Sequence, residues 1–99
     1  MVNKQQAREL ALKEIKKNWD IEDDEPVIVD EDTMEEDFGW VFFYESRIYV
    51  ETQIFSYCLA GNAPIIVNRQ DGSVFITGTA HPFEQYLEEY QKELAKRQS

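Results

Sequence analysis

The segment FGWVFFYES, Phe38 to Ser46, most constrains the fold, because it is a strand former that is apolar on both of its faces. Side chains alternate across a strand, so its large residues divide into two sets: Trp40, Phe42 and Tyr44 on one face, Val41 and Phe43 on the other. Such a strand is typical of the centre of a sheet that is covered on both sides. We expect Val27–Val29, which follows Pro26, to be its antiparallel neighbour.

The segment Leu59–Pro82 combines strand formers with turn residues. Ile65–Asn68 and Val74–Thr77 are predicted strands, and the RQDG sequence between them predicts a hairpin connection in which Gly72 supplies a positive φ. The remaining turn residues have distinct expected places: Gly61, Asn62 and Pro64 in the entrance turn, Gly78 at the end of the hairpin, and Thr79 or His81 as the cap of a helix whose first turn contains Pro82.

Apolar residues at helical spacing predict a helix over Lys4–Asn18, with Asn3 as its N-cap, and a second helix after Pro82. We expect the acidic run at residues 30–37 to be a turn or loop, since its charges disfavour a sheet interior. Arg47–Ala60 is expected to form a loop that tucks its aromatic side chains under the sheet.

The order helix, strand, strand, loop, strand, strand, helix predicts an α+β fold. We expect a four-stranded antiparallel sheet built from two hairpins, with the N-terminal and C-terminal helices packed on it. With 99 residues, the chain has the length of one domain, and we expect residues 1–99 to form it.

Charge narrows the class of partner. Twenty acidic residues face ten basic ones, a formal net charge of −10. Such a surface repels nucleic acid and anionic membranes and attracts a basic protein. The acids concentrate between Asp20 and Asp37, where eleven occur without a base. The one cysteine, Cys58, the lack of a secretory signal and the lack of a membrane-length apolar run lead us to expect a cytoplasmic protein.

The sequence indicates no catalytic, cofactor-binding or metal-binding residue. One His and one Cys do not make a zinc site, and Asp30, Asp32 and Glu35 lack the glycine and the spacing of a calcium loop. A nucleophile–base pair would need Cys58 and His81, but a free cysteine between Tyr57 and Leu59 is typical of a small buried apolar residue. We therefore expect neither an enzyme nor a cofactor.

Protein binding is the class that the residues favour. We expect a partner to contact the acids Asp23, Asp24, Glu31, Asp32, Glu35, Glu36 and Asp37, although charge runs are more often only solvated surface. An exposed aromatic residue can add an anchor, because interface hot spots favour Trp and Tyr. The candidates for this role are Trp40, Tyr44 and Tyr49.

Several short motifs within Leu59–Tyr90 together resemble the immunity protein 35 family, also called YrhB-like. They are the GNAP turn, the apolar strand after it, the DG hairpin, the GTA-x-P turn and the E-x-Y-x-x-x-Y helix. The upstream Gly39–Tyr44 matches the aromatic strand of the family, and the acidic run at residues 20–37 lies outside the resemblance. The resemblance implies a small bacterial immunity protein that binds and neutralises a cognate toxin of a polymorphic toxin system. It carries over no catalytic residue.

Three functions follow as hypotheses. The first is a toxin-neutralising protein whose acidic segment approaches a basic toxin surface, such as that of a nuclease, and occludes its active site. The second is a heat-stable, chaperone-like holdase, which would need an exposed apolar patch. The third is a small enzyme, which would need a pocket with convergent polar groups. The oligomeric state is not indicated, but a bare sheet edge would permit pairing between chains.

Overall fold

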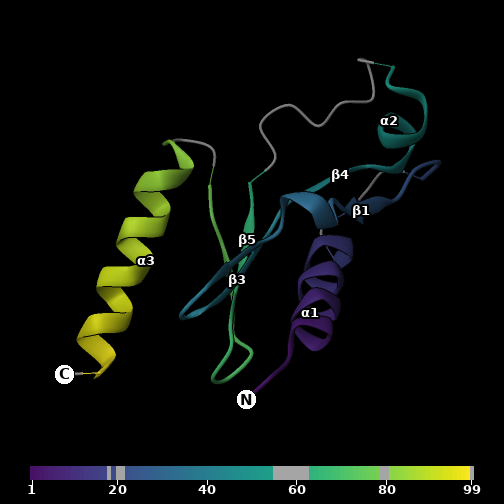
Figure 1. Ribbon diagram of the computed structural model, residues 1–99. Coiled ribbons are helices and arrows are strands. Elements are labelled where there is room, and N and C mark those ends of the chain that lie inside the picture. The colour runs from purple at the N-terminus through teal and green to yellow at the C-terminus, as the bar shows by residue number, and fades with distance from the viewer. Residues whose placement is uncertain (18, 20–21, 55–62, 79–80, 99) are drawn as a thin grey trace.

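The computed structural model describes residues 1–17, 19, 22–54, 63–78 and 81–98 (Figure 1). Its elements are, in chain order, the helix α1 (Lys4–Lys17), the strand β1 (Pro26–Ile28), the 3-10 helix η1 (Asp30–Asp32), the strands β2 (Met34–Glu36), β3 (Gly39–Phe42) and β4 (Tyr44–Ser46), the helix α2 (Arg47–Thr52), the strands β5 (Ile65–Asn68) and β6 (Val74–Ile76), and the helix α3 (Phe83–Gln98).

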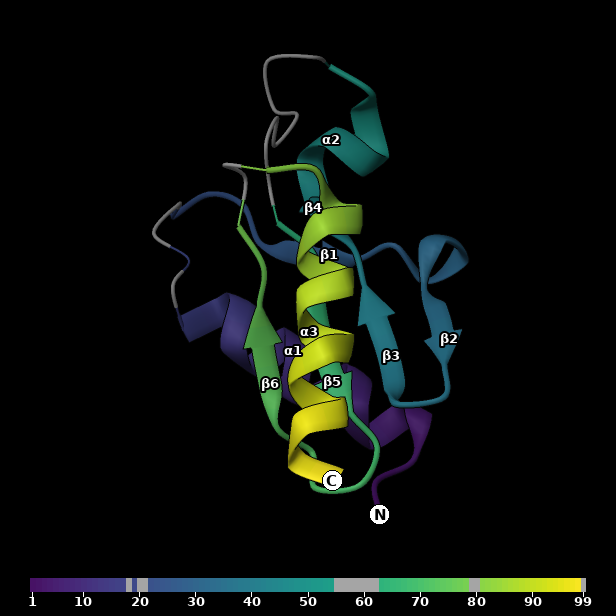
Figure 2. The same ribbon diagram turned by 90° about the vertical axis from the view of Figure 1, so that its left-hand side faces the viewer.

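The predicted α+β fold is confirmed. Strands β2, β3, β5 and β6 form a four-stranded sheet in that order, and every neighbouring pair is antiparallel. Helices α1 and α3 lie on opposite faces of this sheet, as both views show (Figures 1 and 2). Strand β3 is central in the sheet, with β2 on one side and β5 on the other.

The chain from β1 to β4 forms one long antiparallel hairpin that is interrupted on its acidic arm. Ile28 pairs with Tyr44, and nearer the turn Met34 pairs with Val41. Between these pairs, residues 29–33 face only residues 42 and 43, so the acidic arm is longer by three residues. We call residues 29–33 the acidic bulge; η1 lies within it.

The predicted antiparallel pairing of residues 27–29 with the segment Phe38–Ser46 is confirmed for β1, which pairs with β4 at the end of that segment. This pair forms a separate two-stranded sheet, and β2 is the neighbour of β3 in the four-stranded sheet. The loop predicted over residues 30–37 is wrong for Met34–Glu36, which form β2. This strand tolerates its charges because it is an edge strand, with β3 as its one neighbour in the sheet.

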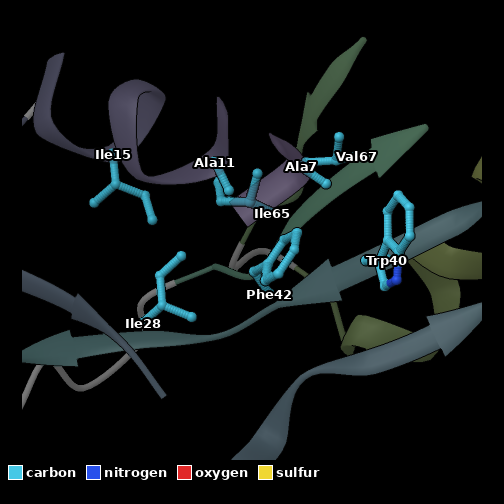
Figure 3. Packing of buried hydrophobic residues seen from close by; sticks show 8 residues of the cluster. All are labelled: Ala7, Ala11, Ile15, Ile28, Trp40, Phe42, Ile65 and Val67. Carbon is cyan, nitrogen blue, oxygen red and sulfur yellow. The ribbon is translucent and has the colours of Figure 1, made fainter. Parts of the chain in front are cut away.

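The apolar core has two halves, one on each face of the sheet. Trp40 and Phe42 face α1, where they pack with Ala7 and Ala11 (Figure 3), whereas Val41 packs on the α3 side. The predicted alternation of these side chains is therefore confirmed. Trp40 is only 4% exposed, so this side chain does not reach the surface and is not the exposed anchor considered above. Full burial of a side chain such as Phe42 contributes about 1.5–3 kcal/mol.

Helix α1 begins as predicted, and α3 follows Pro82 as expected, whereas its cap by Thr79 or His81 stays a prediction, since Thr79 lies outside the described residues. Asn3 caps α1 through a reciprocal pair of bonds: its side chain accepts from Gln6 N at 2.8 Å, and the Gln6 side chain accepts from Asn3 N at 2.9 Å. On α3, Phe83, Leu87, Tyr90 and Leu94 contribute to the second half of the core. The Tyr90 hydroxyl accepts a hydrogen bond from the buried Asn68 side chain at 3.2 Å.

The predicted loop over Arg47–Ala60 is wrong for its first residues. Residues 47–52 form α2, because Ser46 supplies an N-cap and its hydroxyl accepts from Tyr49 N at 3.2 Å. Phe55, Tyr57 and Cys58 lie outside the described residues, as do the turn residues Gly61, Asn62 and Thr79.

The second hairpin is confirmed. Ile65 pairs with Ile76 and Val67 with Val74, and Gly72 has a φ of 72° in the connecting turn. The other predicted turn residues that the structure describes are Pro64, Gly78 and Pro82. Pro64 is buried before β5, and Gly78 follows β6. At the start of α3, the Pro82 carbonyl accepts a hydrogen bond from Gln85 N at 3.0 Å.

Gly39 is a second position that requires glycine. Its φ is 150°, and a Cβ there would collide with the Val67 carbonyl oxygen and lie 2.9 Å from Arg69 N. Both obstacles are backbone atoms of the neighbouring strand and of the turn after it, so neither can move without disturbing the pairing of β3 with β5.

We predict that Gly39→Ala lowers the free energy of unfolding by at least about 2 kcal/mol, from backbone strain and overpacking together. The matched control is Gly72→Ala, where a Cβ would meet only flexible side chains at 3.3 Å and the cost is about 1–2 kcal/mol of left-handed strain. Urea unfolding of the three proteins measures both values. A Gly39→Ala protein as stable as the parent would contradict this view of the hairpin.

Candidate functional site

The acidic bulge is held to the hairpin by its own backbone. Val29 N donates to the Phe43 carbonyl at 2.9 Å, and inside the bulge Asp32 N donates to the Val29 carbonyl at 3.0 Å. The side chains of Glu31 and Asp32 are exposed. The bulge is therefore a hydrogen-bonded turn that presents carboxylates to solvent.

A second contact ties the bulge to α1. Arg8 Nε and Nη2 donate to the two carboxylate oxygens of Asp30 at 2.7 and 3.1 Å, a forked ion pair. The hydrogen bond from Arg8 is the main reason that the pKa of Asp30 lies below its usual range. An exposed pair of this kind adds only about 0.2–1 kcal/mol of stability. Its main effect is geometric, because two parallel hydrogen bonds fix the orientation of the bulge relative to α1.

Asp24 holds the start of α2 in place. Its carboxylate accepts hydrogen bonds from Ile48 N at 3.1 Å, from Glu25 N at 2.8 Å and from the buried Ser46 hydroxyl. Its carbonyl accepts from Trp19 Nε1 at 3.1 Å. Desolvation raises the pKa of the carboxyl, but these bonds outweigh it and hold the pKa below its usual value. Asp24 thus has a structural role, and its predicted contact with a partner stays a prediction.

Between the acidic bulge, β4 and α2 lies a groove of about 350 Å³. Carboxylates and apolar side chains meet in it; it is lined by Val29, Glu31, Asp32, Phe43, Tyr44, Glu45, Tyr49, Val50 and Gln53. A second depression, of about 360 Å³, shares Val29, Glu31 and Val50 with it and extends along β1. We call the two together the bulge groove.

The side chains of the bulge groove suit a protein partner. Val50 is 46% exposed, although it is a large apolar residue, and Tyr44 is half-buried, with its pKa raised by burial and by Glu45. Among the described residues, no ion pair joins Glu31 or Asp32 to a base. The groove therefore offers unneutralised carboxylates beside exposed apolar surface.

A separate acidic depression lies at the turn of the hairpin. It is lined by Glu35, Glu36, Asp37 and Arg69 and has a volume of about 380 Å³. Arg69 partly neutralises it: its Nη2 donates to the Glu36 carbonyl at 2.8 Å and lies 3.6 Å from the Glu35 carboxylate. The guanidinium also stacks over Trp40, 4.8 Å from the ring centre. Arg69 thus lies beside one of the three carboxylates, and among the described residues no ion pair joins Glu36 or Asp37 to a base.

The structure thus divides the predicted contact residues. It brings Glu31, Asp32 and Tyr44 together in the bulge groove and gathers Glu35, Glu36 and Asp37 at the hairpin turn. Asp23 is exposed and lines neither depression, and Asp24 and Trp40 have structural places.

Sequence reasoning missed Phe43 and Val50 as groove residues. Both depend on tertiary pairing: Phe43 lies opposite the bulge, and Val50 belongs to α2. The local signal for α2 was Ser46, a good N-cap residue directly before a run without Gly or Pro.

Within the described part of the chain, no set of three or more His, Cys, Asp and Glu side chains is placed to hold a metal ion. None of the helices there has the length and apolarity that a membrane crossing requires. His81 is exposed and its ring lies 5.9 Å from that of Tyr86; Cys58 lies outside the described residues, so a pairing of the two cannot be placed.

We predict that Asp24→Asn lowers the free energy of unfolding by about 1–2 kcal/mol at pH 7, because it weakens the hydrogen bonds that hold α2. The folded pKa of Asp24 lies below the unfolded value of about 3.9. Its contribution is therefore fully present well above pH 4 and is lost as the pH falls through the folded pKa. The difference between parent and variant should shrink accordingly in urea unfolding at about pH 3.

The matched control is Asp23→Asn, which removes the same charge from the neighbouring, exposed residue. We expect its stability to stay within about 0.5 kcal/mol of the parent. Equal effects of the two substitutions would show that net charge, and not the Asp24 hydrogen bonds, accounts for the loss.

Comparison with known proteins identifies one relative and a family. The uncharacterized protein YrhB of Escherichia coli (strain K12) is 43% identical over 53 residues, which cover 54% of this chain and 56% of YrhB. The matched region thus spans little more than half of that relative. No solved structure matches the chain. The sequence profile of the immunity protein 35 family matches residues 5–93, nearly the whole chain, and the protein therefore belongs to the immunity protein 35 family.

Proposed function

We propose that this member of the family binds a cognate toxin domain with a basic surface and neutralises it by occlusion, with the bulge groove as part of the contact. The observation that carries the proposal is the pairing, in one groove, of the unneutralised Glu31 and Asp32 with the exposed apolar Val50. The protein would act as one domain, without a cofactor and without catalysis, in the cytoplasm of a bacterium that encodes the toxin.

Electrostatics supports a basic partner. The chain carries a formal net charge of −10, so its field attracts a cationic surface at long range. At short range, the carboxylates of the bulge select the partner and its orientation. A toxin that acts on nucleic acid needs such a cationic surface for its own substrate, which makes a nuclease domain a suitable partner.

The aromatic residues of the groove support a stable complex. Interface anchors are typically Tyr, Trp or Arg side chains in a desolvated pocket. Tyr44 and Tyr49 line the groove beside Val50, and each is partly buried already, so binding would restrict them little further. Slow dissociation would come from these side chains, and fast association from the carboxylates.

Preorganisation of the groove is the third support. The forked pair of Arg8 and Asp30 orients one wall, and the hydrogen bonds from Ser46 and Ile48 to Asp24 fix the other. A surface that is ordered before binding loses less conformational entropy in the complex.

We predict that Glu31→Gln combined with Asp32→Asn slows association with the toxin domain encoded beside the gene by about tenfold at low salt. The effect should disappear as salt rises, since screening removes steering in the parent too. Stopped-flow association rates at low and high ionic strength measure this. The matched control, Glu84→Gln with Glu89→Gln, removes the same charge from exposed positions on α3 and should stay near the parent rate.

An unchanged association rate and salt dependence in the Glu31→Gln, Asp32→Asn protein would rule out steering by the bulge. The chaperone-like alternative has a separate readout: a holdase would suppress aggregation of a heat-denatured client without any toxin. Suppression that persists in the double variant, together with no toxin binding by the parent, would favour that alternative.

A further inference from the structure

The floor of the bulge groove is one face of the two-stranded sheet of β1 and β4, the face turned away from α1. Ile28 packs with the apolar residues of α1, and Tyr44, which lies opposite it, packs against the same cluster. Side chains alternate along a strand, so Val29, Phe43 and Glu45 belong to the other face, and all three line the groove. The acidic bulge and α2 supply the remaining lining residues.

The charged groups of the groove are hydrogen-bond acceptors. Of the described residues that line it, Glu31, Asp32 and Glu45 are acids and none is basic. Glu45 is half-buried, and its Oε1 accepts a hydrogen bond from Ser46 N at 3.0 Å, which holds this carboxylate in place. A ligand that fills the groove must therefore supply a positive charge and several donors.

Gln53 adds a further acceptor at the end of α2. Its Nε2 donates to the Tyr49 and Val50 carbonyls, each at 3.2 Å. Because a carbonyl can only accept, the amide nitrogen must face these two groups, and both of its hydrogens are used. The polar atom of the Gln53 side chain that remains for a ligand is the amide oxygen.

Aromatic rings stand beside these acceptors. Phe43 and Tyr49 line the groove, and each is partly exposed. A guanidinium has five N–H donors in one plane and weakly hydrated faces that stack on rings, whereas an ammonium is a compact, strongly hydrated charge. The molecule already holds one guanidinium in this way: that of Arg69 lies 4.8 Å from the Trp40 ring centre and 3.6 Å from the Glu35 carboxylate. Acceptors beside a ring therefore favour arginine over lysine.

We propose that the bulge groove receives one arginine side chain of the protein partner. Its guanidinium lies against the Tyr49 ring and donates hydrogen bonds to the Glu31 and Asp32 carboxylates. The groove volume of about 350 Å³ is near the lower end of the range of about 300–1,000 Å³ for small-molecule sites, so it suits one side chain and not a helix. The inference rests on the proposed function, because it names the group by which the toxin domain is recognised.

Two small probes test the groove without any toxin. N-acetyl-L-arginine amide and N-acetyl-L-lysine amide carry the same charge on different side chains. Each is titrated at constant ionic strength to about 100 mM, because a single side chain binds weakly, and backbone amide shifts are followed by NMR. We expect the arginine probe to shift the amides of Asp32, Tyr49 and Gln53 together. It should bind about three- to fivefold tighter than the lysine probe, a gain that comes from stacking.

Substitutions at Tyr49 separate stacking from charge. Tyr49→Leu removes the ring and should lower the affinity of the arginine probe to that of the lysine probe. The matched control, Tyr49→Phe, keeps the ring and should keep the difference. Glu31→Gln with Asp32→Asn changes two exposed residues and should weaken both probes, whereas Glu84→Gln with Glu89→Gln on α3 should weaken neither. Circular dichroism verifies folding, and the variant at Glu31 and Asp32 carries the test if Tyr49→Leu does not fold.

A double-mutant cycle extends the test to the toxin domain encoded beside the gene. Each arginine of that domain is replaced by lysine in turn, and dissociation of the complex is measured. We expect one of these changes to speed dissociation by about tenfold from the parent protein, which is the size of a direct contact. The same change should have little effect on the complex of Tyr49→Leu, because the ring that the arginine stacks on is absent.

Equal binding of the two probes by the parent overturns the proposal, as does a folded Tyr49→Leu protein that still prefers arginine. A bound toxin domain in which no arginine couples to Tyr49 also overturns it. Two outcomes separate this inference from the proposed function. Toxin association without arginine selectivity rejects the inference alone, whereas arginine selectivity without toxin association rejects the proposed function and keeps the groove as an arginine site.

Discussion

The molecule depends on the burial of β3 from both sides. Trp40 and Phe42 are covered by α1, and Val41 is covered by α3, so this strand has no freedom to shift its register. A shift of one residue would send every one of these side chains to the opposite face. The longer acidic arm of the hairpin must therefore accommodate its extra residues outside the ladder, and it does so where β3 passes into β4. The extra residues are mostly acidic, and because a buried carboxylate is costly, they are more stable outside the sheet than within it.

The same constraint positions the candidate site. Phe43 lies at the junction of β3 and β4, where its carbonyl holds the bulge and its ring packs 5.8 Å from that of Phe83 on α3. Arg8 on α1 holds the bulge from the other face of the sheet. The bulge groove is thus connected to both long helices, although it lies at the surface. The bulge is thus positioned by contacts with β3–β4 and α1 and not only by its own turn hydrogen bonds.

Local patterns predicted the elements whose causes are local. The alternation of β3, the Gly72 hairpin and the helix after Pro82 each follow from period and turn chemistry, and each is confirmed. The site was predicted less completely, because its causes are distant in the chain. Ile48 donates to Asp24 across a separation of 24 residues, and no local pattern specifies that pairing. The burial of Trp40 under α1 likewise depends on packing that alternation alone does not specify.

Charge is distributed unevenly across the sheet. The bulge groove borders β1 and β4, and the edge strand β2 carries two glutamates, whereas the opposite edge strand, β6, carries no ionisable group. The field of the carboxylates is therefore strongest on the side of the acidic bulge, and a cationic surface would be attracted to that side first. The burial of β3 that forces the extra acidic residues out of the ladder thus also determines the direction of this attraction.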